Sequence, residues 1–349
     1  MEMKKEKDIF FENNGLYAHT SHMINGDAFI IAEASVENHS SEDQEVWIDI
    51  HMHQLIDNQK VQMDEEPGIK AAGAIKLFVP AGECQTARTQ ICVEDAAVWS
   101  IAHPILYVVE AVLYKAVPEG EALPNPRLLA GMALEEPHSM KMLDFQETHF
   151  GIRTVTVDVK NGFCLNGEMI KLKGGRYENS EAAVFELQYQ LVTKYKENGY
   201  NAILIEQGQA SEHLIECCSR LGVLVLEEVS DGESIRRDRN APSVVVWIAK
   251  DMKTDEIRKY DSTRYIGGIC DAAVGMRDDA FDRHLWNDAT EKICAPWSVC
   301  GYPDVNSNYR EAHALFPNRV MFAVSDEPEA IWEDVQKYPY VIGVLAKNA

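Results

Sequence analysis

The feature that most constrains the fold of this chain is a change in its hydrophobic pattern near residue 150. Before that point, apolar and polar side chains alternate along short segments such as 28–36 and 46–52, which is the period of half-buried β-strands. After it, near-continuous apolar runs alternate with segments of helical period. The change indicates a β-rich first half, followed by a parallel sheet that helices cover on both faces.

The first half contains short strands separated by turn-rich stretches at 38–43, 64–73, 80–82 and 118–126. Regular short strands without a long helical pattern predict an antiparallel β-sandwich of immunoglobulin-like size. The paired cysteines and intervening tryptophan of true immunoglobulin domains are not evident, so we expect only the architecture to be shared. We assign residues 1–148 to this domain.

The second half contains eight apolar runs of strand length, which predict a closed (β/α)8 barrel of the TIM type over residues 149–349. The runs lie at 170–172, 202–205, 223–226, 244–247, 265–269, 299–302, 320–324 and 341–345. Segments 181–198 and 212–221 have helical period, and Gly222 supplies a stop for the second. The half is shorter than the ~250 residues of a typical barrel. It leaves room for only short helices within 228–241 and 252–263, so we expect a shortened barrel.

The composition argues against several classes of protein. Lys and Arg number 33 against 56 Asp and Glu, a formal charge of −23 that disfavours nucleic-acid binding. No apolar run approaches the ~20 residues that span a bilayer, and the charged amino terminus lacks the apolar core of a signal peptide. The eight cysteines show no paired spacing, which is typical of reduced thiols. We therefore expect a cytoplasmic protein that binds neither nucleic acid nor membrane.

No sequence pattern predicts a cofactor or a metal site. The glycine pairs at 174–175 and 267–268 end or interrupt strands, and neither opens a helix with the spacing of a phosphate loop. His51 and His53 lie two positions apart on one strand, but no third ligand stands at a supporting spacing. We interpret these histidines as residues of a solvent-facing sheet surface.

Several segments are similar to the motifs of one enzyme family. They lie at 98–100, 103–107, 150–153, 163–168, 171–175, 196–203, 218–228, 237–247, 316–320 and 338–343, including FGIR at 150–153 and PSVVVW at 242–247. Their order along the chain resembles glycoside hydrolase family two, which contains β-galactosidases, β-glucuronidases and β-mannosidases. The resemblance implies a sandwich followed by a barrel. The motifs begin at the sandwich, so we expect no counterpart of the sugar-binding jelly roll that begins the family's chains.

The resemblance implies a retaining mechanism, which needs two carboxylates about 5–5.5 Å apart. Aligning the barrel motifs places Met252 at the acid/base position and Ser325 at the nucleophile position. A thioether has no proton to donate, and a serine without a neighbouring base is a poor glycosyl nucleophile. We therefore expect no catalytic residue at the family positions. The chain is then a homologue that has lost hydrolysis and serves as a carbohydrate-related binding or assembly module.

The alternative is an active retaining exo-glycosidase, similar to a β-galactosidase, that uses displaced carboxylates. Asp251 would act as acid/base, with Asp326 or Glu327 as nucleophile. This alternative requires the carboxylate of Asp251 to lie at a glycosidase distance from that of Asp326 or Glu327 in one open cleft.

A carbohydrate ligand would contact residues near the carboxyl ends of the strands. The resemblance points to six substrate-binding candidates: Tyr177, Glu178, Gln207, Glu228, Trp247 and Tyr302. Glu227 and Glu228 are adjacent on a strand and point to opposite sides. We therefore expect only Glu228 to lie in the barrel mouth, hydrogen-bonded there.

A barrel that ends after its eighth strand predicts self-association. Segment 341–345 would lack the helix that covers its outer face, and an exposed apolar face favours a homodimer. Alternatively, the sandwich or the apolar residues Ile9, Phe10 and Phe11 cover that face within one chain.

Overall fold

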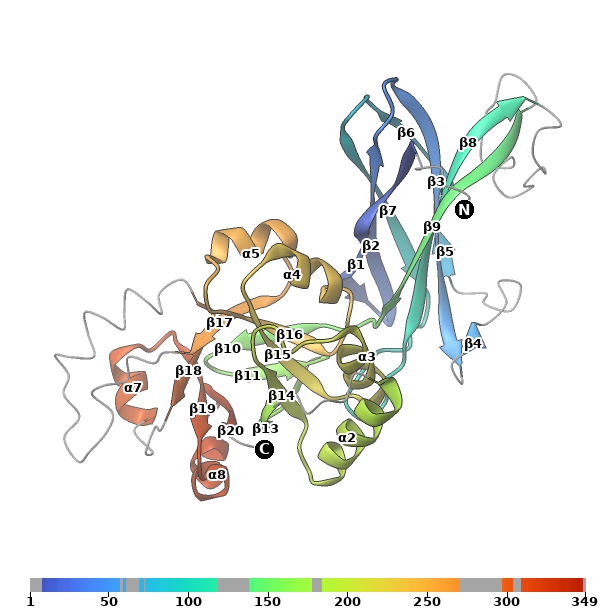
Figure 1. Ribbon diagram of the computed structural model, residues 1–349. Helices are drawn as coiled ribbons and strands as arrows, with labels where there is room; N and C mark the ends of the chain where they lie inside the picture. Colours follow the sequence, from blue (N-terminus) through green and yellow to red (C-terminus); the bar gives the residue numbers. More distant parts are fainter. Residues whose placement is uncertain are drawn as a thin grey trace. The chain divides into compact units, whose positions relative to one another are not determined.

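The computed structural model describes residues 8–56, 59–60, 69–71, 73–118, 138–177, 184–269, 297–303 and 309–347 (Figure 1). The chain divides into two compact units: Met1–Ala97 with Ile105–Ile152, and Val98–Pro104 with Arg153–Ala349. The main division lies a few residues beyond the boundary expected at 148. Segment Val98–Pro104 precedes that division in the sequence but groups with the second unit.

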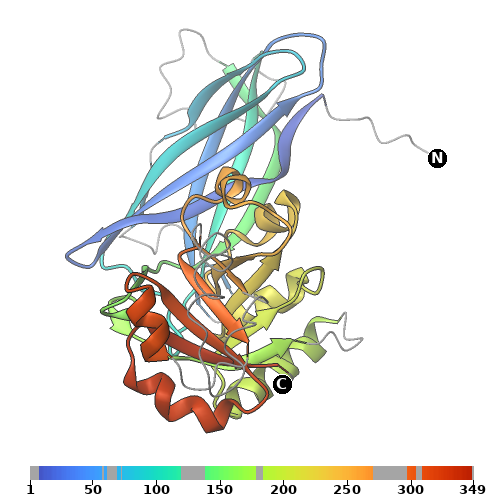
Figure 2. The same cartoon turned by 90° about the vertical axis from the view of Figure 1, so that its left-hand side faces the viewer.

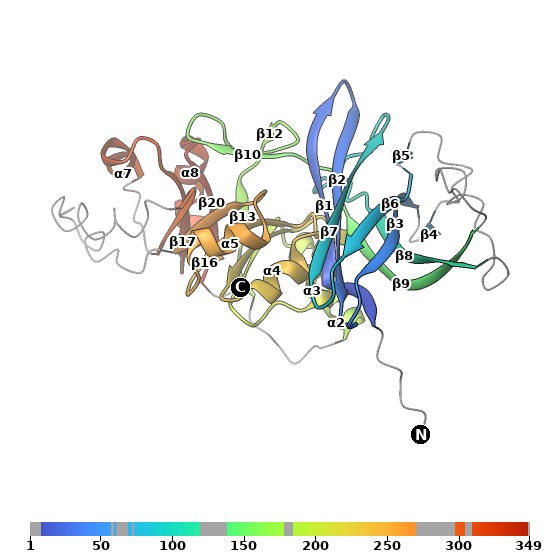
Figure 3. The same cartoon turned by 90° about the horizontal axis from the view of Figure 1, so that it is seen from above.

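The first unit is an antiparallel sandwich of two sheets (Figure 3). One sheet has the order β1 (Ile9–Ile24), β2 (Asp27–Asn38), β7 (Cys84–Val93) and β5 (Ile69–Ala71). The other has the order β4 (Gln59–Lys60), β3 (Gln44–Ile56), β8 (Tyr107–Pro118) and β9 (His138–Phe150), with β6 (Ile75–Val79) paired to β3. Alternate residues of β2 are fully buried, as the period of two predicts.

The outer face of β3 differs from the expectation for its histidines. His53 is buried, and its Nε2 lies 3.4 Å from Oε2 of Glu110 on the neighbouring strand. His51 is half-buried, with its Nε2 3.0 Å from Oδ2 of Asp49. The prediction of a solvent-facing position is therefore wrong for His53. The reason is that the pairing of β3 with β8 places a carboxylate beside it, a contact the sequence of one strand does not reveal.

The second unit is a closed barrel of eight parallel strands. In chain order they are β13 (Leu172–Tyr177), β14 (Ala202–Ile205), β15 (Leu224–Val229), β16 (Val244–Ala249), β17 (Tyr265–Ile269), β18 (Val299–Pro303), β19 (Val320–Ser325) and β20 (Val341–Ala346). β20 pairs with β13 and closes the ring. The predicted sandwich and TIM-type barrel are thus confirmed.

The first barrel strand begins later than expected, at Leu172 instead of residue 170. The Nζ of Lys171 donates to the carbonyl oxygens of Tyr338 (2.6 Å) and Val341 (2.5 Å). The backbone N–H of Ile170 donates to the oxygen of Phe163 in a small antiparallel sheet formed by β10 (Val155–Asp158), β11 (Gly162–Leu165) and β12 (Glu168–Met169). Residues 170–171 therefore join this sheet to the barrel and precede the strand.

The described helices lie outside the ring of strands (Figures 1 and 3). They are α2 (Phe185–Glu197), α3 (Glu212–Leu221), α4 (Gly232–Asp238), α5 (Thr254–Tyr260), α7 (Tyr309–Leu315) and α8 (Pro328–Lys337). The short helices expected within 228–241 and 252–263 are α4 and α5. α3 has the predicted bounds because Ser211 Oγ accepts from Leu214 N (3.2 Å) at its start and Gly222 is left-handed, with φ of 70°, at its end.

The outer face of the last strand is covered, contrary to the expectation. All residues of β20 are buried, and α8 packs beside the strand (Figure 2). Val335 of α8 and Val344 of β20 share one apolar cluster with Tyr340. Ile9 and Phe11 are buried within the sandwich, where β1 pairs with β2. The prediction of an exposed apolar surface at 341–345 is therefore wrong, because a helix preceding the strand supplies the cover.

Candidate functional site

Alternation along the barrel strands decides which side chains face the interior. Val225 of β15 packs in an apolar cluster with helix residues such as Leu214. Val225 and the residues at every second position from it therefore face outward, toward the helices. The side chains at the alternate positions point into the barrel, and those in the interior are apolar and fully buried. These are Leu172, Leu204, Leu226, Val246, Ile248, Phe322, Val324 and Leu345.

Charged residues occupy the next inward positions, at the carboxyl ends of six strands. We call this end of the barrel the mouth, and the three ion pairs formed there the mouth pairs. They are Arg176–Glu206, Lys250–Glu228 and Lys347–Asp326. In five of the strands the charged residue comes two positions after the last apolar residue that points inward. In β13, Arg176 comes two positions after Gly174, which occupies the corresponding inward position.

Glu228 is the most buried member of the mouth pairs. Its side chain is only 6% exposed, and Oε2 accepts from Lys250 Nζ at 3.0 Å and from the backbone N–H of Gln207 at 3.3 Å. The hydrogen bond to Glu228 raises the pKa of Lys250, against a smaller opposing effect of burial. Glu206 raises this pKa further and Arg176 lowers it, so the two neighbouring mouth pairs interact electrostatically.

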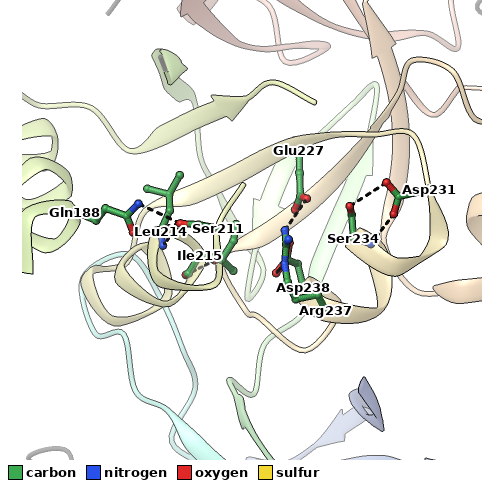
Figure 4. Close-up of polar contacts among 10 residues, drawn as sticks. Gln188, Ser211, Leu214, Ile215, Glu227, Asp231, Ser234, Arg237 and Asp238 are labelled. Atoms are coloured by element: carbon green, nitrogen blue, oxygen red, sulfur yellow. Dashed lines mark hydrogen bonds and ion pairs between the residues drawn. The ribbon is translucent and has the colours of Figure 1, made fainter. Parts of the chain in front are cut away.

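The outward neighbour, Glu227, lies in a separate buried network beneath α4 (Figure 4). Arg237 binds Asp238 through two nitrogens, and its Nη2 is 3.8 Å from Glu227 Oε1. Burial, together with the charge of Asp238, raises the pKa of Glu227 well above its usual value. Burial also raises the pKa of Asp238, although Arg237 opposes that effect. Glu227 therefore belongs to the packing of strand against helix and not to the mouth.

Trp247 faces the same outer layer and does not reach the mouth. Its side chain is fully buried, and Nε1 donates to Asp261 Oδ2 at 2.9 Å. Arg264 Nη1 donates to the same oxygen at 2.8 Å. Burial tends to raise the pKa of Asp261, but Arg264 and Thr263 outweigh it and hold this pKa well below its usual range. The tryptophan thus helps to anchor an ionised carboxylate between β16 and the loop after α5.

The two predicted tyrosines also lie outside the ring of strands. Tyr177 packs against Val192 of α2, in the same cluster as Trp247. Tyr302 is fully buried in the cluster around α7 and α8, and its hydroxyl accepts from Arg319 Nη1 at 3.0 Å. Of the six predicted substrate-binding residues, the mouth therefore brings together Glu228 and the backbone of Gln207. Glu178 lies outside the described residues.

The two residues that the resemblance assigns to catalytic positions, Met252 and Ser325, point away from the mouth as well. Met252 is half-buried against the outer apolar cluster. Ser325 pairs with Ala346 in the outward phase of β19, and its Oγ accepts from the backbone N–H of Glu327 at 3.1 Å. Asp251 and Glu327 are exposed, and Asp326 is held by Lys347 at 2.9 Å.

The cations of the mouth were not among the predicted site residues, although a pattern in the sequence indicates them. Arg176, Lys250 and Lys347 all stand in the inward phase of their strands, as Glu206 does. Counting in steps of two from the buried apolar residues would have found them. Trp247 was predicted instead because it is aromatic, but its position in the alternation of β16 places its side chain on the outer face.

Within the described ranges, no group of three or more His, Cys, Asp or Glu side chains has a geometry that could hold a metal ion. In the same part of the chain, no helix combines the length and apolar character needed to cross a bilayer.

Comparisons with known proteins show what this chain is similar to. No protein-family model matches the chain. A β-galactosidase of Bacteroides ovatus, BoGH2A, is 23% identical over 266 residues, covering 67% of this chain and 27% of its own. Mouse β-glucuronidase is 25% identical over 149 residues, covering 35% of this chain and 23% of its own. A solved family-two member from Bacteroides cellulosilyticus superposes with a TM-score of 0.75 at 22% identity, covering 98% of this chain. These neighbours point to glycoside hydrolase family two.

The likeness to family two extends over both units but not over whole relatives. The chain covers 44% of the Bacteroides cellulosilyticus structure. It covers 47% of a Bacteroides uniformis β-glucuronidase, which superposes with a TM-score of 0.68 at 17% identity. At these identities the structural likeness establishes the shared fold. The activity of the relatives does not transfer to this chain on that ground.

Proposed function

We propose that this chain is a family-two homologue that does not hydrolyse glycosides and serves as a carbohydrate-related binding or assembly module. The proposal rests on the mouth pairs, since each carboxylate there has a lysine or arginine as its partner. A retaining glycosidase needs two carboxylates that face a sugar across a gap of about 5–5.5 Å. Carboxylates that are ion-paired with a lysine or arginine are poorly placed to act on a sugar, and Met252 and Ser325 supply no replacement.

A binding role is supported by the polar groups that remain at the mouth. The Nε of Arg176 is buried and has no hydrogen-bond acceptor among the residues described. An unsatisfied buried donor favours a ligand oxygen that can accept from it. Sugar hydroxyl and carboxylate oxygens are acceptors of this kind. We also propose the cytoplasm as the location, on the ground of the acidic composition and the unpaired cysteine spacing.

The alternative, an active glycosidase, depends on Asp251 with Asp326 or Glu327. Asp251 is exposed, whereas the acid of such an enzyme works from an apolar pocket. Asp326 is 62% exposed and paired with Lys347. We therefore favour the non-hydrolytic function.

Hydrolysis assays test the proposal directly. The full chain is incubated with nitrophenyl β-glucuronide, β-galactoside and β-mannoside between pH 5 and pH 8. We expect no release of nitrophenol above buffer, because no described pair of free carboxylates faces a substrate in the mouth. Calorimetry with the corresponding methyl glycosides then measures binding without turnover, in the native chain and in Arg176→Met.

The triple variant Asp251→Asn, Asp326→Asn, Glu327→Gln is the matched control for the assays. Turnover by the native chain that disappears in this variant would establish the alternative. Turnover that persists equally in both would indicate a contaminating enzyme and leave no activity to assign to this chain.

A further inference from the structure

Three charged side chains form a buried network between β15 and α4 (Figure 4). Glu227 on the strand and Asp238 at the end of the helix are both buried, and Arg237 contacts the two. The Nε of Arg237 donates to Asp238 Oδ1 at 2.9 Å, whereas its Nη2 lies 3.8 Å from Glu227 Oε1. Oε2 of Glu227 is buried and has no hydrogen-bond partner among the residues described. The guanidinium therefore binds Asp238 closely and neutralises Glu227 poorly.

The charged groups on the neighbouring elements do not correct this imbalance. Burial and the charge of Asp238 raise the pKa of Glu227, and Arg264 in the loop after α5 opposes them. The guanidinium of Arg264 is already bound to Asp261 Oδ2 at 2.8 Å. Burial also raises the pKa of Asp238, and the charge of Glu212 in α3 adds to that effect. Two ionised carboxylates with one guanidinium would leave an excess negative charge out of reach of water, which is costly, and one shared proton removes it.

The network holds the last turn of α4 on the barrel. This helix has seven residues, of which Ile235 and Asp238 are buried. Its first turn packs on α5 instead, where the ring of Tyr260 lies against Gly232 and 5.5 Å from the guanidinium of Arg236. A helix this short depends on packing for its stability. Repulsion between the two carboxylates would therefore act on one of the few contacts that keep α4 in place.

We propose that α4 is a pH-dependent latch, which stays docked on β15 while Glu227 and Asp238 share one proton and detaches more readily as the pH rises and both ionise. In the detached form both carboxyl groups reach water, where they ionise at the ordinary pH of a carboxylic acid. Rising pH therefore favours detachment. The next residue of β15 is Glu228, so the latch acts on a strand that supplies the mouth pairs. The proposal does not depend on whether the mouth binds or hydrolyses a sugar.

Amide hydrogen exchange of the full chain between pH 5 and pH 8, corrected for the intrinsic exchange rate, provides the test. The N–H of Arg239 reports on α4, since it donates to the carbonyl of Ile235 at 2.8 Å. We expect its protection factor to fall with rising pH, by up to about tenfold per pH unit, because each opening releases one proton. The N–H of Val223, which donates to Cys218 at the end of α3, is the reference for unfolding of the unit. Arg239 should be less protected than Val223 and less sensitive to about 1 M urea, because detachment exposes little surface. Equal protection and equal urea dependence at the two amides would overturn the proposal.

Three variants separate the shared proton from other effects of pH. Glu227→Gln is neutral at every pH, and Asp238→Asn leaves one carboxylate for Arg237. Each should make the protection of Arg239 nearly independent of pH. Glu233→Gln is the matched control, since Glu233 is exposed on the same helix, and it should keep the native pH dependence. Native protection that does not change with pH would contradict the latch, as would a pH dependence that survives in both Glu227→Gln and Asp238→Asn.

Discussion

Two buried carboxyl groups share one guanidinium beneath α4. Glu227 and Asp238 are 1% and 2% exposed, and Arg237 is the cation that contacts both. A buried pair of carboxylates with one positive partner carries an excess negative charge that is costly to desolvate. Holding one proton between them removes this cost. This explains why the pKa of Glu227 is raised well above its usual value.

Glu227→Gln tests this interpretation. Because its pKa is raised in the folded state, the stability that Glu227 contributes is fully present below about pH 4.5. This contribution is lost as the pH rises toward the folded pKa, because the unfolded chain releases its proton first. Glutamine keeps the neutral form at every pH. We therefore expect the variant to gain stability relative to the native protein as the pH rises, by about 1.4 kcal/mol per pH unit within that window. Urea unfolding at pH 5 and pH 8 measures the difference.

Glu233→Gln is the control, since Glu233 is exposed on the same helix. Its effect on the free energy of unfolding should be within about 0.5 kcal/mol at both pH values. An equal response of the two variants to pH would show that Glu227 is ionised in the folded protein.

One residue fixes the end of helix α3. Gly222 adopts φ of 70°, and its N–H donates to the carbonyl of Cys218. A Cβ built on Gly222 would lie 2.4 Å from the carbonyl oxygen of Ile101. Two constraints therefore act on this position: the left-handed backbone and the close approach of another backbone segment.

We expect Gly222→Ala to lower the free energy of unfolding of the barrel unit by about 3 kcal/mol or more. Gly167→Ala separates the two constraints. Gly167 also has a positive φ, of 83°, but no atom lies within 4 Å of the added Cβ. This control should cost only about 1 kcal/mol, the cost of left-handed backbone in a residue with a side chain. Equal losses in denaturant unfolding would mean that Ile101 moves away freely.

The periodicity of apolar residues in the sequence predicts helices and strands better than it predicts which residues contact one another. Segment 212–221 ends at Gly222 because a left-handed glycine terminates a helix whatever surrounds it. The start of β13 at Leu172 could not be predicted, because it depends on where Lys171 finds carbonyl partners 167 and 170 residues away.

The two units of the molecule are not consecutive stretches of sequence. Segment Val98–Pro104 groups with the barrel. Trp99 is fully buried there, and its Nε1 donates to the carbonyl of Ser219 in α3 at 2.8 Å. The carbonyl of Trp99 accepts from Asn166 Nδ2 at 2.9 Å. The barrel unit therefore includes a segment that, along the sequence, comes after β7 and before β8 of the sandwich.

Trp99→Phe should destabilise the barrel unit, by about 1–3 kcal/mol, because the substitution leaves the buried Ser219 carbonyl without its donor and removes packed volume. Hydrogen exchange of α3 amides reports the loss. Trp47→Phe is the matched control, because Trp47 packs with Met140 within the sandwich. It should accelerate exchange in β3 and leave α3 unchanged. Protection of α3 that is the same in Trp99→Phe and in the native protein would contradict the assignment of this segment to the barrel.

The sequence by itself determined the order and type of the elements: a sandwich, then eight parallel strands with short helices at α4 and α5. Backbone periodicity and local caps act over a few residues, so they can be found along one dimension. The sequence also determined that Glu227 and Glu228 face opposite sides of their strand. Only the tertiary structure decided which cations pair with the carboxylates of the mouth. It also decided that Trp247, Tyr177 and Tyr302 pack between the strands and the helices outside the barrel. Those outcomes depend on strand register and ring closure, which bring together residues from different strands that no local pattern connects.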